Sequence, residues 1–313
     1  MAFKGKINGS KLDEFILTGF SPEPHIQKLL YVVFLLIYLV TIFANACVIF
    51  LVNTNPHLKI PMYYFISNLA FLDISYSSCI APKTLVDLLS HHKAISYFGC
   101  ATQLFFYSGL GSTESFLFAV MAYDRYMAIC NPLIYQLIMQ QRTCVRLVYG
   151  AYSGGFLHSL IETCCTFRLS FCASHVLHHF VCDFPPLLKI SCMDTTINEI
   201  VLFTFSSLVT MSSILVIVAS YISIVLAVMK ISSTDGRLKA FSTCASHITA
   251  VILFYGTVLY VYLRPKSQSS IETGSVASVF YTMVIPMLNP LIYSMRNKDI
   301  KLSLQRLLAL KKR

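Results

Sequence analysis

The sequence predicts an all-α membrane protein, a seven-transmembrane helix bundle with its N-terminus outside and a short amphipathic helix after the seventh span. The composition is the first reason: 56% of the 313 residues are hydrophobic and only 12% are charged, whereas about a quarter of a soluble domain is charged. The second reason is a set of seven apolar runs, each near the roughly 20 residues that a helix needs to cross a bilayer. These runs cover residues 29–52, 62–82, 101–123, 143–165, 200–229, 240–263 and 275–295.

Runs of this length are expected to be helices, because a chain in lipid must satisfy its backbone hydrogen bonds internally. The first and fifth runs contain no charge, and the fourth is the weakest because it is rich in Gly, Ser and Tyr. No second domain is indicated. We expect an extracellular N-terminus over residues 1–28, the bundle over 29–295, and a cytoplasmic tail over 296–313. In that tail one apolar helical face is formed by Ile300, Leu304, Leu307 and Leu308, a pattern typical of a helix that lies on the membrane surface.

The charge distribution sets the expected orientation. With the N-terminus outside, the inner segments carry 14 of the 24 Lys and Arg residues but only three of the 14 acidic residues, as the positive-inside rule requires. The basic excess therefore indicates topology and contact with the lipid bilayer rather than nucleic-acid binding. Asn8-Gly9-Ser10 is an N-glycosylation acceptor, which agrees with an extracellular N-terminus. We predict a multi-pass protein of the plasma membrane.

Four cysteines fall on the outer side, where an oxidising compartment favours disulfides: Cys100, Cys172, Cys182 and Cys192. Four cysteines allow three pairings, and the spacing does not choose among them. The same outer loop contains His175, His178 and His179, which are either metal ligands or solvated side chains. We expect solvated side chains.

Two acidic residues are predicted to lie near the middle of the bilayer. Counted along their helices from the inner boundary, Asp73 lies roughly 18 Å in and Glu114 roughly 16 Å in. If their helices adjoin, the two carboxylates hold a cation such as Na⁺ or share a proton; the alternative is a hydrogen-bonded pair with a packing role. No other cofactor is expected. Glu162 is expected near the outer boundary, in contact with water.

Several polar motifs end the apolar spans at the inner face. The third span ends in MAYDRYMAIC, which includes Asp124, Arg125 and Tyr126, and Tyr221 lies near the inner end of the fifth span. The seventh span carries PMLNPLIYSMRN, with Asn289, Pro290 and Tyr293. A proline removes one backbone hydrogen bond and kinks a helix, so this span is a plausible hinge.

These motifs, with PMYYFISNLAFLD, KAFSTCASH and the loop HHFVCDFPPLLKISC, resemble the motif set of vertebrate odorant receptors of the class II (tetrapod-type) branch, which are rhodopsin-like G-protein-coupled receptors. The resemblance extends over essentially the whole chain, in the same order. It implies that Arg125 is held by Asp124 in the inactive state and released on activation, with support from Tyr221 and Tyr293. It also implies that Cys100 pairs with Cys182 and Cys172 with Cys192, and that Asp73 and Glu114 form a buried acid pair. The implied partners are a small volatile odorant and a heterotrimeric stimulatory G protein that raises cAMP.

The ligand is expected to be small and mostly neutral, because residues 100–113 of the third span carry no charge. Helical spacing places two sets of side chains on single faces. The pocket candidates are Leu104, Ser108 and Ser112 on the third span, Phe205 on the fifth, and Tyr255, Val258, Leu259 and Tyr262 on the sixth. Gly109 and Gly111 are interpreted as making room beside the serines. The alternative for each position is ordinary helix packing.

Other functions fit the sequence less well. A transporter commonly shows inverted repeats, and none is found. An enzyme would need a nucleophile, a base and an orienting acid at one depth, or a phosphate-binding loop, and neither is present. The remaining alternative is a receptor of the same fold that acts outside olfaction.

Overall fold

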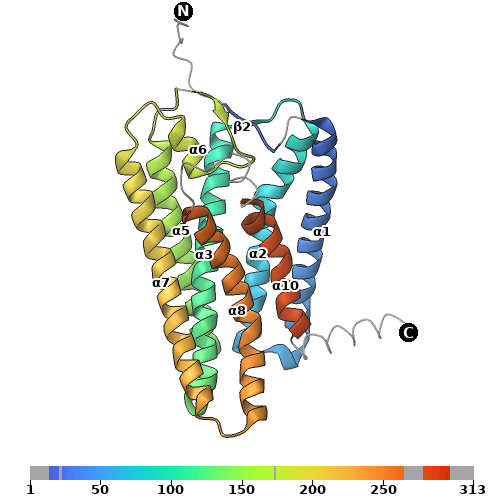
Figure 1. The fold of residues 1–313 in the computed structure, drawn as a ribbon, viewed down its shortest axis with the longest axis vertical. Coiled ribbons are helices and arrows are strands. Elements are labelled where there is room, and N and C mark those ends of the chain that lie inside the picture. The colour runs from blue at the N-terminus through green and yellow to red at the C-terminus, as the bar shows by residue number, and fades with distance from the viewer. Residues whose placement is uncertain (1–13, 21–22, 173, 264–277, 297–313) are drawn as a thin grey trace, which may run out of the picture.

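Seven long helices lie side by side in the structure, a computed structural model (Figure 1). It describes residues 14–20, 23–172, 174–263 and 278–296. The long helices are α1 (Pro24–Thr54), α2 (Pro61–Leu89), α3 (Tyr97–Cys130), α5 (Gln141–Phe167), α7 (Thr196–Met229), α8 (Thr234–Leu263), and a last helix made of η3 (Phe280–Val284) and α10 (Ile285–Arg296). Each of the seven predicted spans falls on one of these helices, so the predicted fold class is confirmed. Asn8 and the predicted amphipathic helix lie outside the described residues.

Local sequence explains several helix boundaries. α1 and α2 begin with Pro24 and Pro61, and proline suits the first position of a helix because that residue needs no N–H partner. α3 begins after Ser96, whose hydroxyl accepts the N–H of Gly99 at 3.1 Å. The connections between α1 and α2 and between α3 and α5 hold short helices that the apolar runs do not indicate, namely η1 (Pro56–Leu58) and α4 (Pro132–Ile138). α8 also starts earlier than predicted, at Thr234.

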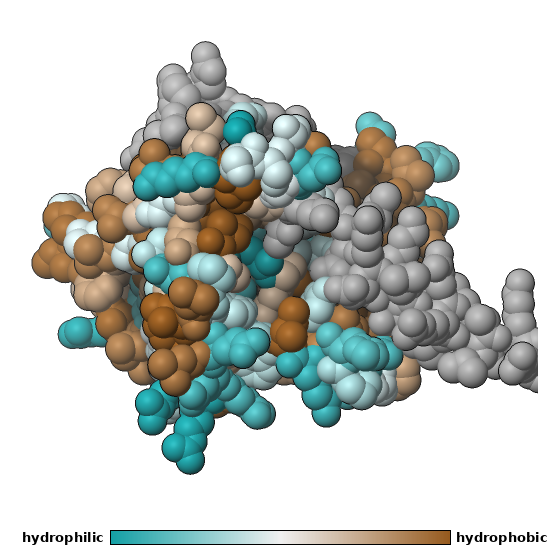
Figure 2. Space-filling view, turned by 90° about the horizontal axis from the view of Figure 1, so that it is seen from below, coloured by the Kyte–Doolittle hydropathy of each residue, from teal (hydrophilic) through white to brown (hydrophobic). Residues whose placement is uncertain are grey.

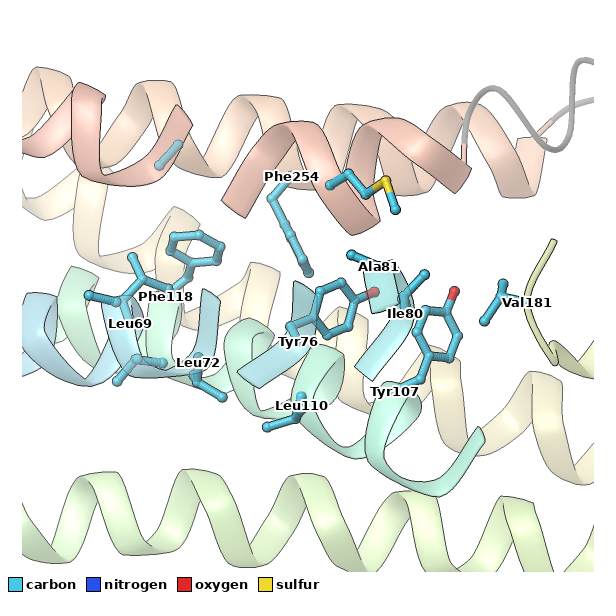
Figure 3. Close-up of a cluster of buried hydrophobic side chains, with 14 of the residues drawn as sticks. Leu69, Leu72, Tyr76, Ile80, Ala81, Tyr107, Leu110, Phe118, Val181 and Phe254 are labelled. Carbon is cyan, nitrogen blue, oxygen red and sulfur yellow. The ribbon is translucent and has the colours of Figure 1, made fainter. Parts of the chain in front are cut away.

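α3 is the central helix and packs against α2, α5, α7 and α8. Figure 3 shows the apolar core between α2, α3 and α8. The rings of Tyr76 and Tyr107 stack there with centroids 5.6 Å apart, and Phe118 contacts Phe254 at 5.3 Å. Because α3 is surrounded, its polar side chains bond either to neighbouring helices or, as Thr113 and Ser115 do, to carbonyl oxygens of α3 itself.

The outward faces of α1 and α7 are apolar, with exposed side chains such as Phe43, Phe203 and Leu215. Among the described helices, α1, α3 and α7 are long and apolar enough to cross a membrane by composition alone, and α8 is a fourth if its two bent halves are one span. α2 and α5 are 29 and 27 residues long, but they carry buried polar and charged side chains that lower their apolarity. Seen from below, the end of the bundle shows hydrophilic residues among hydrophobic ones (Figure 2).

A small sheet, not foreseen from the sequence, covers the opposite end. β1 (Glu14–Leu17) lies between β2 (Ala94–Ser96), to which it is antiparallel, and β3 (Val176–Leu177), to which it is parallel. Phe15 and Leu17 are fully buried, while Glu14 and Ile16 face outward. These strands have four, three and two residues, too few for an alternating pattern to be recognised. The N-terminal segment thereby joins two loops of this end.

Candidate functional site

The long loop between α5 and α7 is fastened to the bundle by two disulfides. Cys100 pairs with Cys182, with Cα atoms 5.5 Å apart, and Cys172 pairs with Cys192, at 5.7 Å. These are the pairings that the resemblance implies. Gln103 Oε1 also accepts the backbone N–H of Cys182 at 3.0 Å. The loop, which includes α6 (Phe184–Lys189), is therefore held against the outer end of α3.

The loop histidines differ from one another, which corrects the expectation that all three are solvated. His175 and His178 are exposed, but His179 is buried and stacks on Phe180. Its Nδ1 accepts the N–H of Val181 at 3.3 Å, and its Nε2 lies 3.2 Å from Ser278 Oγ. Burial lowers the pKa of His179 below its usual 6.5, so the neutral ring fits this environment.

The His179 contact predicts a pH dependence of stability. Between the lowered folded-state pKa and 6.5 the unfolded chain binds more protons than the folded chain, so stability falls as the pH falls through this window. We expect the wild-type protein to melt at a lower temperature at pH 5.5 than at pH 7.5, with a loss of at most about 1.4 kcal/mol per pH unit. Thermal unfolding in detergent measures this.

The control for this prediction is His179→Gln, which does not titrate. Asp183 faces His179, and burial raises the pKa of its carboxyl, so Asp183 contributes with the opposite sign. The difference between the wild-type protein and His179→Gln isolates the histidine. An equal pH effect in both proteins would rule out His179 as its source.

At the inner end of α3, the charges of MAYDRY form a buried ion pair. Arg125 Nη2 lies 3.5 Å from Asp124 Oδ2, and the two side chains are 9% and 1% exposed. Tyr135 of α4 donates its hydroxyl to Asp124 Oδ1 at 2.8 Å. Tyr126, half-buried, packs near Tyr221 beside a small inner cluster of apolar side chains. Sequence reasoning missed Tyr135, although an aromatic hydroxyl eleven residues after the acid was visible.

The Tyr221 hydroxyl is paired with His247 in this structure. Its hydroxyl lies 2.7 Å from His247 Nδ1, and His247 Nε2 lies 3.1 Å from the carbonyl oxygen of Phe118. α7, α8 and α3 are thereby linked at their inner halves. Tyr293 is buried, and its hydroxyl has no hydrogen-bond partner among the described residues. The roles inferred for Tyr221 and Tyr293 stay predictions.

Near the middle of the bundle, Asp73, Glu114 and Asn289 meet. The Asn289 amide donates to Asp73 Oδ1 at 3.0 Å and to Glu114 Oε1 at 3.3 Å, and all three residues are almost fully buried. The depth argument thus placed the two carboxylates together. The carbonyl oxygen of Pro286, which Pro290 leaves without its helical N–H donor, accepts the Asn45 amide at 3.0 Å.

The pocket candidates differ in how deeply they are buried. Leu104 and Tyr255 are buried, and the Tyr255 hydroxyl donates to the Ser115 carbonyl oxygen at 3.4 Å. Val258 is half-buried, whereas Phe205 and Leu259 are more than a third exposed. These last two therefore lie at the margin of the helix contacts. The side chain of Tyr262 lies outside the described set.

The expectation for Glu162 is wrong. It was placed in water near the outer boundary, but it is 1% exposed. Ser108 donates to its Oε2 at 3.1 Å, Ser206 donates to its Oε1 at 2.6 Å, and His158 Nε2 lies 3.0 Å from Oε1. Ser112 Oγ lies 2.9 Å from His158 Nδ1. The sequence could have indicated the contact between His158 and Glu162, because a His and a Glu four residues apart share one helical face.

The surroundings of Gly109 on α3 favour the packing alternative at that position. A Cβ on Gly109 would lie 2.9 Å from a ring carbon of Phe156, so α5 fills the room that was attributed to a ligand. A hollow of about 410 Å³ lies instead between α2 and α3, lined in part by Lys83, Phe98 and Phe106. It does not include any of the pocket candidates.

The olfactory receptor family model matches residues 34–311. The chain belongs to the olfactory receptor family. It is 51% identical to mouse olfactory receptor 5AP2 over 96% of this chain and 95% of that protein. It is 50% identical to human olfactory receptor 5I1 over 94% of each chain, and 52% identical to the chicken olfactory receptor-like protein COR4 over 94% of this chain and 95% of that protein.

Membership of the olfactory receptor family gives the class of protein to which this helix bundle belongs. Olfactory receptors are G-protein-coupled receptors, which are membrane proteins without enzymatic activity. The resemblance seen in the motifs and the predicted fold are therefore both confirmed. Odorant ligands and G-protein coupling are general features of this family.

Proposed function

We propose that this olfactory receptor binds small, mostly neutral volatile molecules in a pocket on the extracellular side, and activates a stimulatory G protein that raises cAMP. The observation that carries the coupling is the Asp124–Arg125 pair. It is buried, and Tyr135 of α4 holds the acid from the side. A motion of α4 would therefore change what Arg125 contacts.

The pocket is proposed to lie between α3, α5, α7 and α8, below the fastened loop. Leu104 and Tyr255 supply apolar surface, and Ser108 and Ser112 supply hydroxyls. Apolar walls with few polar groups are typical of small-molecule sites. We expect affinities of roughly micromolar or weaker, equivalent to about 8 kcal/mol or less.

The orientation is part of the proposal, with the N-terminus extracellular and the chain in the plasma membrane. The inner excess of Lys and Arg supports it. Both disulfides lie at the same end as β1, and disulfides form in an oxidising compartment.

The experiment that tests this function is cAMP accumulation in cells that express the full chain with an olfactory-type stimulatory G protein. Surface expression is measured in parallel, and a panel of volatile molecules is applied. A concentration-dependent rise in cAMP supports the proposal. A response that appears only with an inhibitory G protein, or as calcium release, would contradict the coupling.

We further propose that Asp73, Glu114 and Asn289 hold a Na⁺ ion or a shared proton. Two ionised carboxylates that face one amide repel each other unless a positive charge lies between them. Asp73 Oδ2 and Asn289 Oδ1 are buried, and neither has a hydrogen-bond partner among the described residues. Free oxygen atoms of this kind suit a hard cation, which would neutralise the site when bound.

Raising Na⁺ at constant ionic strength should therefore stabilise the wild-type receptor. A ligand at ten times its Kd adds about 1.4 kcal/mol, which is a few degrees in Tm for a chain of this size. The measurement is thermal unfolding in NaCl against N-methylglucamine chloride.

Asp73→Asn and Glu114→Gln should lose the stabilisation by Na⁺. Thr84→Val, which removes a buried hydroxyl elsewhere on α2, should keep it. A Na⁺ effect that survives in both carboxamide variants would disprove the ion site; stability that depends on pH and not on Na⁺ would favour the shared proton.

A further inference from the structure

Glu162 is the centre of a hydrogen-bonded cluster that joins three helices. The cluster consists of Ser108 and Ser112 on α3, His158 and Glu162 on α5, and Ser206 on α7. Two serine hydroxyls donate to the Glu162 carboxyl group, and His158 Nε2 lies 3.0 Å from its Oε1. α3 has no acidic side chain at this level, but α5 places Glu162 beside Ser108 of α3.

The donors do not use the full capacity of the carboxylate. An ionised carboxylate offers about four acceptor positions. Oε1 accepts the Ser206 hydroxyl and lies 3.0 Å from His158 Nε2, whereas Oε2 accepts only the Ser108 hydroxyl. One acceptor position therefore remains at Oε2, on the side of α3.

The position of the cluster suits ligand recognition. Ser108 lies eight residues, or roughly 12 Å, along α3 from Cys100, where the loop is fastened. Ser108 and Ser206 are half-buried, whereas Glu162, His158 and Ser112 are buried. The two serines are thus the partly accessible members of the cluster. Leu104, one helical turn before Ser108 on α3, provides buried apolar surface.

We propose, on the basis of the ligand pocket proposed above, that Glu162 is a specificity-determining residue that selects ligands with a hydrogen-bond-donating head. A hydroxyl or an ammonium donates to Oε2 beside Ser108. A ketone, ether or ester brings only acceptor atoms, which the carboxylate repels. A binding site that pairs with a donor discriminates strongly against an analogue that lacks it, because the buried acceptor is then left unpaired.

The test uses the purified full-length receptor and ligand-induced thermal stabilisation, which needs no G protein. The probes are matched trios that share one carbon skeleton, such as octan-2-ol, octan-2-amine and octan-2-one, over several lengths and branchings. We expect alcohols or amines to stabilise the wild-type receptor and the matched ketones to be at least about tenfold weaker. Stabilisation by alcohols assigns the head as a hydroxyl, and stabilisation by amines assigns it as an ammonium.

Glu162→Gln replaces one carboxylate oxygen by an amide donor with little change in shape. It should weaken the donor ligand at least about tenfold, equivalent to 1.4 kcal/mol, and leave the matched ketone unchanged or improved. Thr163→Val is the matched control, because Thr163 is the next residue on α5, is buried, and has no hydrogen-bond partner for its hydroxyl among the described residues. If Glu162→Gln is poorly folded, Ser108→Ala serves instead: it frees Oε2 for the ligand and should preserve or increase the preference for donors.

Several outcomes would overturn the proposal. One is that ketones stabilise the wild-type receptor as well as the matched alcohols and amines do. Another is that no alcohol or amine in the panel stabilises it. A third is that Glu162→Gln weakens all three members of a trio equally, as a purely structural role would. A receptor that is stabilised by donors but raises no cAMP would contradict only the proposed coupling.

Discussion

Replacing Arg125 by alanine should remove most of the ligand-stimulated cAMP response while the receptor still reaches the cell surface. Arg125 is the buried cation at the inner end of α3, with its guanidinium 3.5 Å from Asp124. A hydrogen bond to a charged group contributes about 1.5–3 kcal/mol. Loss of one such contact in the active state lowers the response by roughly tenfold to a hundredfold. The measurement is a cAMP concentration–response curve normalised to surface expression.

Variants of the partners separate a switch from a folding defect. Arg146→Ala removes an exposed charge near the inner end of α5 and should leave the response within about twofold. Tyr135→Phe removes the 2.8 Å bond to Asp124, and Asp124→Asn removes the charge that holds Arg125. Both should raise cAMP in the absence of ligand. A normal response in Arg125→Ala, or unchanged basal activity in Asp124→Asn, would contradict the proposed switch.

The sequence predicts the bundle well because a long apolar run is a strong signal for a membrane-spanning helix. It also brings Asp73 and Glu114 together, since counting residues along two antiparallel helices gives a depth. The same count failed for Glu162, because depth near a helix end does not report burial. Ser108 of α3 and Ser206 of α7 cover Glu162. This burial depends on how three helices pack together, which the sequence does not give.

The side-chain partners of the inner residues were also beyond the sequence. Tyr221 and His247 are 26 residues apart, and their contact depends on how α7 and α8 pack at their inner ends. The three strands were missed because β1 is defined by backbone bonds to two distant loops and not by its own pattern. Contacts between elements, rather than the elements themselves, are what a single sequence leaves undetermined.

Gly155→Ala should destabilise the receptor, although alanine favours a helix by about 1 kcal/mol over glycine. A Cβ on Gly155 would lie 2.7 Å from the backbone nitrogen of Thr113 and 2.8 Å from the carbonyl oxygen of Gly109. Backbone atoms cannot rotate away, so α3 and α5 must move apart. Overpacking of this kind costs about 1–3 kcal/mol, and it would also stretch the 2.6 Å bond from Ser159 to the Phe105 carbonyl oxygen. We expect a net loss on the order of 1–2 kcal/mol, or several degrees in Tm.

Gly150→Ala is the matched control on the same helix, because a Cβ at Gly150 meets no atom within 4 Å. It should gain the helix-propensity term alone and leave Tm equal or slightly higher. The contrast also tests the ligand site indirectly, because separation of α3 from α5 pulls Ser108 and Ser112 away from Glu162 and His158. Gly155→Ala should therefore weaken ligand binding as well as folding, whereas Gly150→Ala should weaken neither. Equal melting temperatures for the two variants would show that the close approach of α3 and α5 is not what holds this cluster together.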